Sequence, residues 1–193
     1  MKIFSTTVFL VALLLACAVV GRSQTTPADA KHFSKDGVLF DYLPSWTLQD
    51  DSNSDAQQLT LARADSDVQI RVFAHRGRVT EEKMPQARKA FIDTYIDATM
   101  KQFIQMGAKP EQSPDSTDIG TSKAEGVNIK ASLGGETGAA KIYWALIGQR
   151  VVVLTYFGPD KDLKKQSAAW DLLRGTLQVE EKKPSPKPSP SPK

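Results

Sequence analysis

The sequence predicts an α/β domain of the α+β type, in which an antiparallel sheet is sandwiched by helices. Residues 141–157, KIYWALIGQRVVVLTYF, form the most apolar run outside the N-terminal segment, and Gly148-Gln149 interrupts this run near its middle. A two-residue loop with glycine first favours a type II′ turn, so the run predicts a β-hairpin with Ile147 opposite Arg150. Segments with helical periodicity precede and follow it, which supplies the helices of the sandwich.

Both faces of the predicted hairpin are apolar, because side chains alternate between the two faces of a strand. An antiparallel pair that is apolar on both sides needs cover on both sides, so helices or another sheet must pack above and below it. Its aromatic side chains are therefore predicted to belong to the core. One face carries Ile142, Trp144, Leu146, Val151 and Val153, and the other carries Tyr143, Ala145, Val152, Leu154 and Tyr156.

Several shorter strands are predicted from alternation and turn signals. Asp36-Gly37 is a turn signal, and Gly134-Gly135 predicts the turn that leads into the hairpin. Two segments alternate well enough to be paired strands. The predicted strands ahead of the hairpin are residues 38–42, 46–48, the pair 58–62 and 68–74, a short strand near 118–119, and 127–133.

The longest helix is predicted over residues 80–106. Thr80 suits the N-cap position and Glu81 follows in the first turn, where negative charge complements the helix dipole. Gly107 suits the left-handed position after the last turn. This helix is predicted to cover one face of the hairpin. A second helix is predicted from Asp160 to Gly175, with Leu163, Ala169, Trp170 and Leu173 on its apolar face, and a last strand at residues 176–179.

The two ends of the chain differ from the middle in composition. Residues 1–24 have a lysine near the start, a strong apolar run and then small polar residues, which is typical of a secretory signal peptide. Residues 25–32 are predicted to be a linker and residues 33–180 the folded domain. Residues 181–193 are rich in proline, serine and lysine and are predicted to be a disordered tail. We therefore expect a protein exported to the periplasm or outside the cell.

Cys17 lies inside the N-terminal apolar run, and Leu14-Leu15-Ala16-Cys17 resembles the lipobox of bacterial lipoproteins. In that interpretation Cys17 is lipidated and anchors the mature protein to a membrane. The apolar run continues after Cys17, which instead favours ordinary cleavage near Ser23 or Gln24. Both alternatives stay open, and neither leaves a transmembrane span in the mature chain.

The net charge of +3 comes from the ends of the chain. Six positive and no negative side chains lie in residues 1–22 and 182–193, so the remainder carries −3. An acidic body argues against nucleic acid as a partner, because such proteins carry a basic face in the folded part. The lysines of the tail favour contact with an anionic envelope surface, or are simply solvated.

Catalytic chemistry has few residues to use in this chain. Its one cysteine lies in the predicted leader, it has two histidines, and it contains none of the common hydrolase, metal or nucleotide motifs. We predict no catalytic residues, no metal and no cofactor, and the paired aspartates are interpreted as turn and helix caps. The one candidate site is a loop in which His75, Arg76 and Arg78 bind an anion, with a solvated basic loop as the alternative.

Two stretches of this sequence resemble the PsbP-like family, which includes DcrB-like exported bacterial proteins. They are GVLFDYLPSW at residues 37–46 and the hairpin, helix and strand after residue 141. The resemblance covers roughly residues 33–179 and implies α/β/α layers and a binding or accessory role. Its members act as extrinsic photosystem subunits, small-GTPase binders or envelope factors, so the fold alone does not select a function.

These observations predict an exported, non-enzymatic binding or accessory module of the bacterial envelope, whose partner is an unidentified envelope protein or polymer. The first alternative is a periplasmic carrier that holds a small ligand between the sheet and the long helix. The second alternative is a hydrolase with an unrecognised site.

Overall fold

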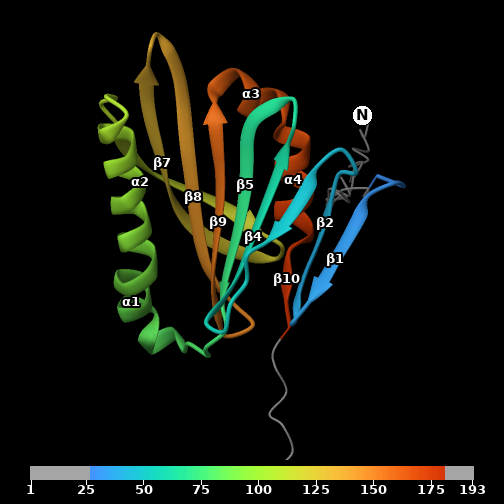
Figure 1. Cartoon of the computed structure of the whole chain (residues 1–193). Helices are drawn as coiled ribbons and strands as arrows, with labels where there is room; N and C mark the ends of the chain where they lie inside the picture. Colours follow the sequence, from blue (N-terminus) through green and yellow to red (C-terminus); the bar gives the residue numbers. More distant parts are fainter. Residues whose placement is uncertain (1–26, 181–193) are drawn as a thin grey trace, which may run out of the picture.

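A computed structural model describes residues 27–180 of the chain. The predicted signal peptide with Cys17, and the predicted tail at residues 181–193, lie outside the described residues. The predicted fold class is confirmed, since a large antiparallel sheet has helices on both of its faces (Figure 1). No helix within residues 27–180 combines the length and apolar character needed to span a bilayer.

Seven strands form the large sheet, and every neighbouring pair in it is antiparallel. In spatial order the strands are β3 (Thr47–Asp50), β4 (Ala56–Arg63), β5 (Ser66–His75), β9 (Arg150–Pro159), β8 (Glu136–Ile147), β7 (Ser122–Leu133) and β6 (Glu111–Ile119). The predicted hairpin is thus β8 and β9, with β9 at the centre of the sheet. Its predicted register is confirmed, with Ile147 opposite Arg150.

The predicted turn type of this hairpin is wrong. Gly148 and Gln149 both have positive φ, 55° and 60°, which is a type I′ turn and not the predicted type II′ turn. Two contacts hold Gln149 in this conformation: its carbonyl accepts from the Val79 amide at 2.8 Å, and its side chain accepts from Arg78 Nε at 2.7 Å. Neither contact is visible from local sequence.

Two helical segments cover the large sheet, one on each face. The first, here called the long helix, spans residues 81–105. Thr80 occupies its N-cap position, as predicted, although the Thr80 side chain makes no capping hydrogen bond. The second is interrupted at Gln166 and continues through Gly175, which was predicted to end it. The helices are η1 (Glu81–Lys83, 3₁₀), α1 (Met84–Ala87), η2 (Arg88–Asp93, π), α2 (Thr94–Gln105), α3 (Asp160–Lys165) and α4 (Ser167–Thr176).

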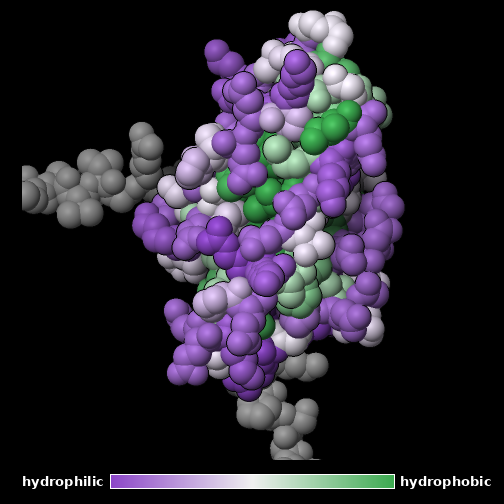
Figure 2. All heavy atoms as spheres, turned by 90° about the vertical axis from the view of Figure 1, so that its left-hand side faces the viewer, coloured by the Kyte–Doolittle hydropathy of each residue, from purple (hydrophilic) through white to green (hydrophobic). Residues whose placement is uncertain are grey.

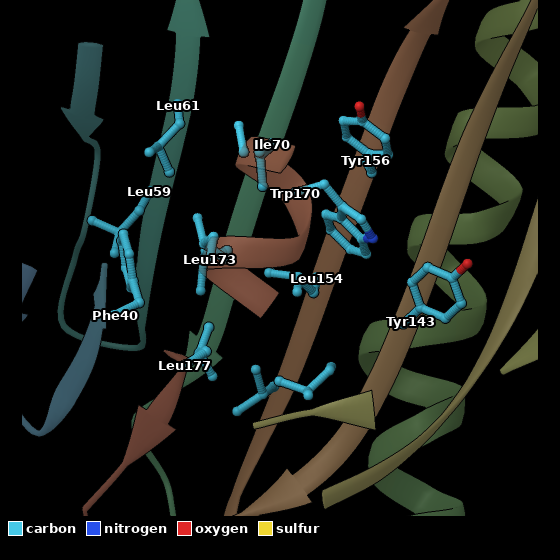
Figure 3. Close-up of a cluster of buried hydrophobic side chains, with 14 of the residues drawn as sticks. Phe40, Leu59, Leu61, Ile70, Tyr143, Leu154, Tyr156, Trp170, Leu173 and Leu177 are labelled. Carbon is cyan, nitrogen blue, oxygen red and sulfur yellow. The ribbon is translucent and has the colours of Figure 1, made fainter. Parts of the chain in front are cut away.

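The two apolar faces of the hairpin lie in two separate cores, as the alternation predicts. Trp144 and Val153 pack in the core beneath the long helix, together with Ile92 and Ile96. The opposite face packs against the second helical segment. Figure 3 shows this second core, in which Tyr143, Leu154 and Tyr156 of the hairpin meet Trp170 and Leu173 of α4, next to Phe40, Leu59, Leu61, Ile70 and Leu177.

A second, smaller sheet completes the layer on the α4 side. It consists of β1 (Lys31–Lys35), β2 (Val38–Tyr42) and β10 (Gln178–Val179), with β2 in the middle. Val38 and Phe40 are fully buried in the core that α4 also covers. The last predicted strand therefore exists, but it pairs with β2 in a separate sheet.

The edge strand β6 is longer than predicted. Only a short strand near residues 118–119 was expected, whereas β6 runs for nine residues. Most of its side chains are exposed and it has one neighbouring strand, so its composition is as polar as that of a loop. Edge strands commonly carry polar residues and proline, and Pro114 lies within this one.

Arg150 joins the two sheets from a buried position. It is 7% exposed, and its guanidinium donates to the carbonyls of His75 at 2.8 Å, Asp36 at 3.0 Å and Ala74 at 3.1 Å. It also donates to Gln57 Oε1 at 2.6 Å. Burial, with the nearby Arg76, lowers the pKa of Arg150 below its usual value. Its acceptors come from the β1–β2 turn, β4 and β5, so one side chain fixes three segments.

Replacing Arg150 tests this role. We expect Arg150→Ala to lower the free energy of unfolding by about 3 kcal/mol, because several buried acceptors lose their donor at once. Urea denaturation measures the loss. The control is Lys101→Ala, which truncates an exposed lysine of α2 and has an expected loss of about 0.5 kcal/mol or less. Equal small losses in both variants would mean that Arg150 does not connect the sheets energetically.

Candidate functional site

The long helix covers only part of the sheet face on which it packs. Seven strands spaced about 4.8 Å apart span roughly 29 Å, whereas one helix with its side chains is about 10–12 Å wide. Ile92 and Ile96 pack over residues of β7, β8 and β9. The long helix therefore does not cover the same face of β4 and β5, which lies beside the helix.

An open groove, here called the helix–sheet groove, runs between the long helix and this uncovered part of the sheet. Its larger cavity has a volume of about 620 Å³, a floor from β4, β5 and β9, and a wall from residues 90–98. A second cavity of about 180 Å³ extends toward Met106 at the end of α2. Both cavities are lined by Arg71, Tyr95 and Thr155, so they adjoin. Figure 2 shows apolar residues among hydrophilic ones on this side of the molecule.

The floor of the groove carries a row of polar side chains across three strands. Thr60 of β4 is opposite Arg71 of β5, and Arg71 is opposite Thr155 of β9. Directly opposed residues on one face have Cβ atoms about 5 Å apart. All three side chains line the larger cavity. The groove thus has one hydroxyl on each side of a guanidinium.

The guanidinium of Arg71 is oriented by two neighbours. Its Nε and one terminal nitrogen donate to Gln69 Oε1, at 3.2 and 2.9 Å, and its central carbon lies 5.3 Å from the centroid of the Phe157 ring. Both neighbours are uncharged. None of the ion pairs formed within residues 27–180 includes Arg71. Its positive charge is therefore free to interact with an anion in the groove.

A π-helical turn forms the wall of the groove at one end. The turn spans Arg88–Asp93 and places Phe91 against Phe73 of β5, with ring centroids 6.2 Å apart. Phe91 also contacts the ring of His75, with centroids 4.6 Å apart. Single π-helical turns occur frequently at functional sites. Here the turn adds aromatic surface to the floor and wall of the larger cavity.

The predicted anion-binding loop lies at the end of β5, and its side chains contact separate partners. His75 packs on Phe91, Arg76 pairs with Asp36 at 2.9 Å, and Arg78 donates to Gln149. No acceptor is shared by the three residues among the contacts within residues 27–180. Anion binding by this loop stays a prediction.

Most of the aromatic residues of the hairpin belong to the core, as predicted. Tyr143, Trp144 and Tyr156 are buried, whereas Phe157 is partly exposed and lines the smaller cavity. The Tyr143 hydroxyl donates to Asp115 at 2.8 Å. Burial, reinforced by this carboxylate, raises the pKa of Tyr143 well above its usual range, so the phenol stays protonated at neutral pH.

The paired aspartates lie at turns, at strand ends and at the start of α3. The predicted helix cap is wrong, because Pro159 occupies the N-cap position of α3 and no side chain makes a capping hydrogen bond there. Asp50 accepts from Lys35 at 2.6 Å, and this hydrogen bond lowers the pKa of Asp50 to about 2. Asp65 accepts from Arg63, which lowers the pKa of Asp65. Within residues 27–180, no group of three His, Cys, Asp or Glu side chains is placed to hold a metal ion.

The row formed by Thr60, Arg71 and Thr155 is not predicted from the sequence. The segment VQIRVFA does carry a signal, because Arg71 lies on the polar side of a strand whose other side is fully buried. That pattern predicts an exposed arginine on a sheet. It does not predict that the long helix stands beside this arginine and turns an exposed face into a groove.

If Arg71 is a binding group and not a structural one, the fold should tolerate its loss. We expect Arg71→Ala to change the free energy of unfolding by at most about 1 kcal/mol, since its partners are an exposed amide and one aromatic ring. Urea denaturation measures this change. A loss as large as that expected for Arg150→Ala would show that Arg71 serves the fold.

Comparison with known proteins supports the fold. No protein-family model matches the chain, and no curated protein matches it. Cyanobacterial PsbP (CyanoP) from Synechocystis sp. PCC 6803 is similar, with 14% identity and a TM-score of 0.50 over 86% of this chain and 98% of that one. A structure from Bacteroides thetaiotaomicron VPI-5482 has 13% identity and a TM-score of 0.52 over 79% of this chain, which spans about half (49%) of that one. At such identities the likeness shows the fold alone, and the chain has a PsbP-like fold.

Proposed function

We propose that this chain is an exported binding module that holds a small molecule in the helix–sheet groove and catalyses no reaction of its own. The groove itself is the main support for this proposal. A cavity of about 620 Å³ is within the range of roughly 300–1,000 Å³ in which proteins bind small molecules. Its lining combines aromatic residues with a few polar groups, which is the usual composition of such sites. Export rests on the sequence pattern of residues 1–24.

The groove favours the carrier over the two other functions that the sequence suggested. A hydrolase needs a nucleophile and a base, or a metal-bound water, within reach of one point. The lining of the larger cavity offers threonines, one tyrosine, one arginine and Asp51, and Asp51 accepts a hydrogen bond from Gln49 at 3.1 Å. This set suits recognition of a ligand better than bond cleavage.

The second candidate function is an accessory module that contacts an envelope protein or polymer. It is favoured by Ile104 and Met106 at the end of α2, whose side chains are 59% and 50% exposed. Crosslinking in cells separates the two functions. An accessory module should lose a stoichiometric partner in Ile104→Ser and keep that partner when the groove is filled. A carrier should keep its ligand in Ile104→Ser and lose the ligand when the groove is filled.

Filling the groove tests the proposal. Ala98 lies on the groove wall and is exposed, so Ala98→Trp should occupy the larger cavity without disturbing the core. We expect small molecules that co-purify with the protein from its natural host, extracted and weighed by mass spectrometry, to fall about tenfold or more. Tenfold corresponds to a loss of about 1.4 kcal/mol in binding.

The matched control is Lys101→Trp, which adds the same ring to an exposed position of α2 outside both cavities. This variant should retain the bound molecules. Equal retention by both variants would contradict the groove as the binding site. Equal melting temperatures of the two variants and the parent protein would confirm that the fold is kept.

A further inference from the structure

We propose that the ligand of the helix–sheet groove is an amphiphile with an oxyanion head group, which Arg71 binds, and an apolar chain that lies along the long helix. This inference rests on the proposed function, because it specifies the ligand class of the same groove. The head group is a carboxylate or a phosphate, since both present oxygen pairs that match a guanidinium.

The head-group site is the row of Thr60, Arg71 and Thr155. The two threonines flank Arg71 on neighbouring strands and the same face. Neither hydroxyl has a protein hydrogen-bond partner within the described part of the chain, and each is free to donate to an oxyanion. A guanidinium with a hydroxyl on each side provides charge-assisted and neutral donors to one group of oxygens. Arg71 is also common to both cavities, so the head group would sit at their junction.

The orientation of Arg71 supports recognition of an anion over a neutral group. Gln69 and Phe157 hold the guanidinium in place, which reduces the entropy lost when a ligand binds. The bonds to Gln69 use Nε and Nη2, while Nη1 has no protein acceptor within residues 27–180. The one carboxylate in the lining is Asp51, on the loop that follows β3, and it lies outside the row. The positive charge of Arg71 therefore dominates the junction.

The apolar part of the ligand has a continuous path in both directions from Arg71. In the larger cavity the path is lined by Phe73 and Phe91, and in the smaller cavity by Phe103 and Phe157. These aromatic side chains are only partly buried, so a ligand chain would remove further apolar surface from water. A compact polar solute would leave this surface exposed. An elongated amphiphile uses the aromatic path and the cationic row together.

Titration calorimetry with four probes of equal chain length tests this inference. Dodecanoate and dodecyl phosphate carry the two oxyanions, 1-monododecanoylglycerol is neutral, and dodecyltrimethylammonium is cationic. Each is used below its micelle concentration, with protein purified from cells that express the full chain and freed of bound molecules. We expect the two anionic probes to bind, the neutral probe to bind more weakly and the cationic probe not to bind. The tighter of the two anionic probes identifies the head group.

Two variants locate the head group. Arg71→Gln keeps a polar side chain, although a shorter one, and removes its charge. It should weaken binding of the anionic probes by about tenfold to a hundredfold while leaving binding of the neutral probe unchanged. Arg88→Gln, which removes an exposed cation of the long helix outside the groove lining, should change nothing.

Two outcomes would overturn the inference. Equal binding of the neutral and anionic probes, unaffected by Arg71→Gln, would remove the oxyanion from the ligand class. Absence of binding by the anionic probes would exclude an anionic amphiphile as the ligand. The proposed function is judged separately, because a loss of natural small molecules in Ala98→Trp would still place a different ligand in the groove.

Discussion

The hairpin of β8 and β9 determines the layers of this fold, because both of its faces are apolar. Neither face can meet water without a large loss of hydrophobic free energy, so the chain must supply a layer on each side. The long helix provides one layer. The second helical segment and the small sheet provide the other. Arg150, at the start of β9, then fixes the small sheet to the large one through hydrogen bonds to uncharged oxygens.

The two layers do not cover the sheet equally, and this inequality produces the candidate site. On the α4 side, two helices and three strands cover the large sheet, and that face of β4 and β5 is buried. On the other side a single helix is too narrow for seven strands. The uncovered face of β4 and β5 carries glutamine, threonine and arginine, and the helix beside it converts that face into a groove. Incomplete coverage of the core thus creates a surface with both aromatic and polar groups.

Much of the fold follows from local sequence, whereas the site depends on tertiary arrangement. The two-residue loop predicts the register of the hairpin, alternation predicts that its two faces lie in two cores, and helical periodicity predicts the position of the long helix. Alternation fails for β6, because an edge strand with exposed side chains is as polar as a loop. The predicted turn type at Gly148 and Gln149 is also wrong, because Val79 and Arg78, from another part of the chain, hold the conformation of this turn. Arg71 lies on the polar side of β5, but the packing of the long helix beside that strand is what places Arg71 in a groove.

If the helix–sheet groove holds the ligand of this protein, amide chemical-shift mapping should locate the bound molecule there. ¹⁵N-labelled protein titrated with dodecanoate should show its largest shifts along Gln58–Thr60 and Arg71–Phe73, and along residues 90–98 of the groove wall. The amides around Trp170 and Leu173, on the far side of the sheet, should stay unchanged. Shifts confined to the α4 side, or spread evenly over the molecule, would contradict the groove as the binding site.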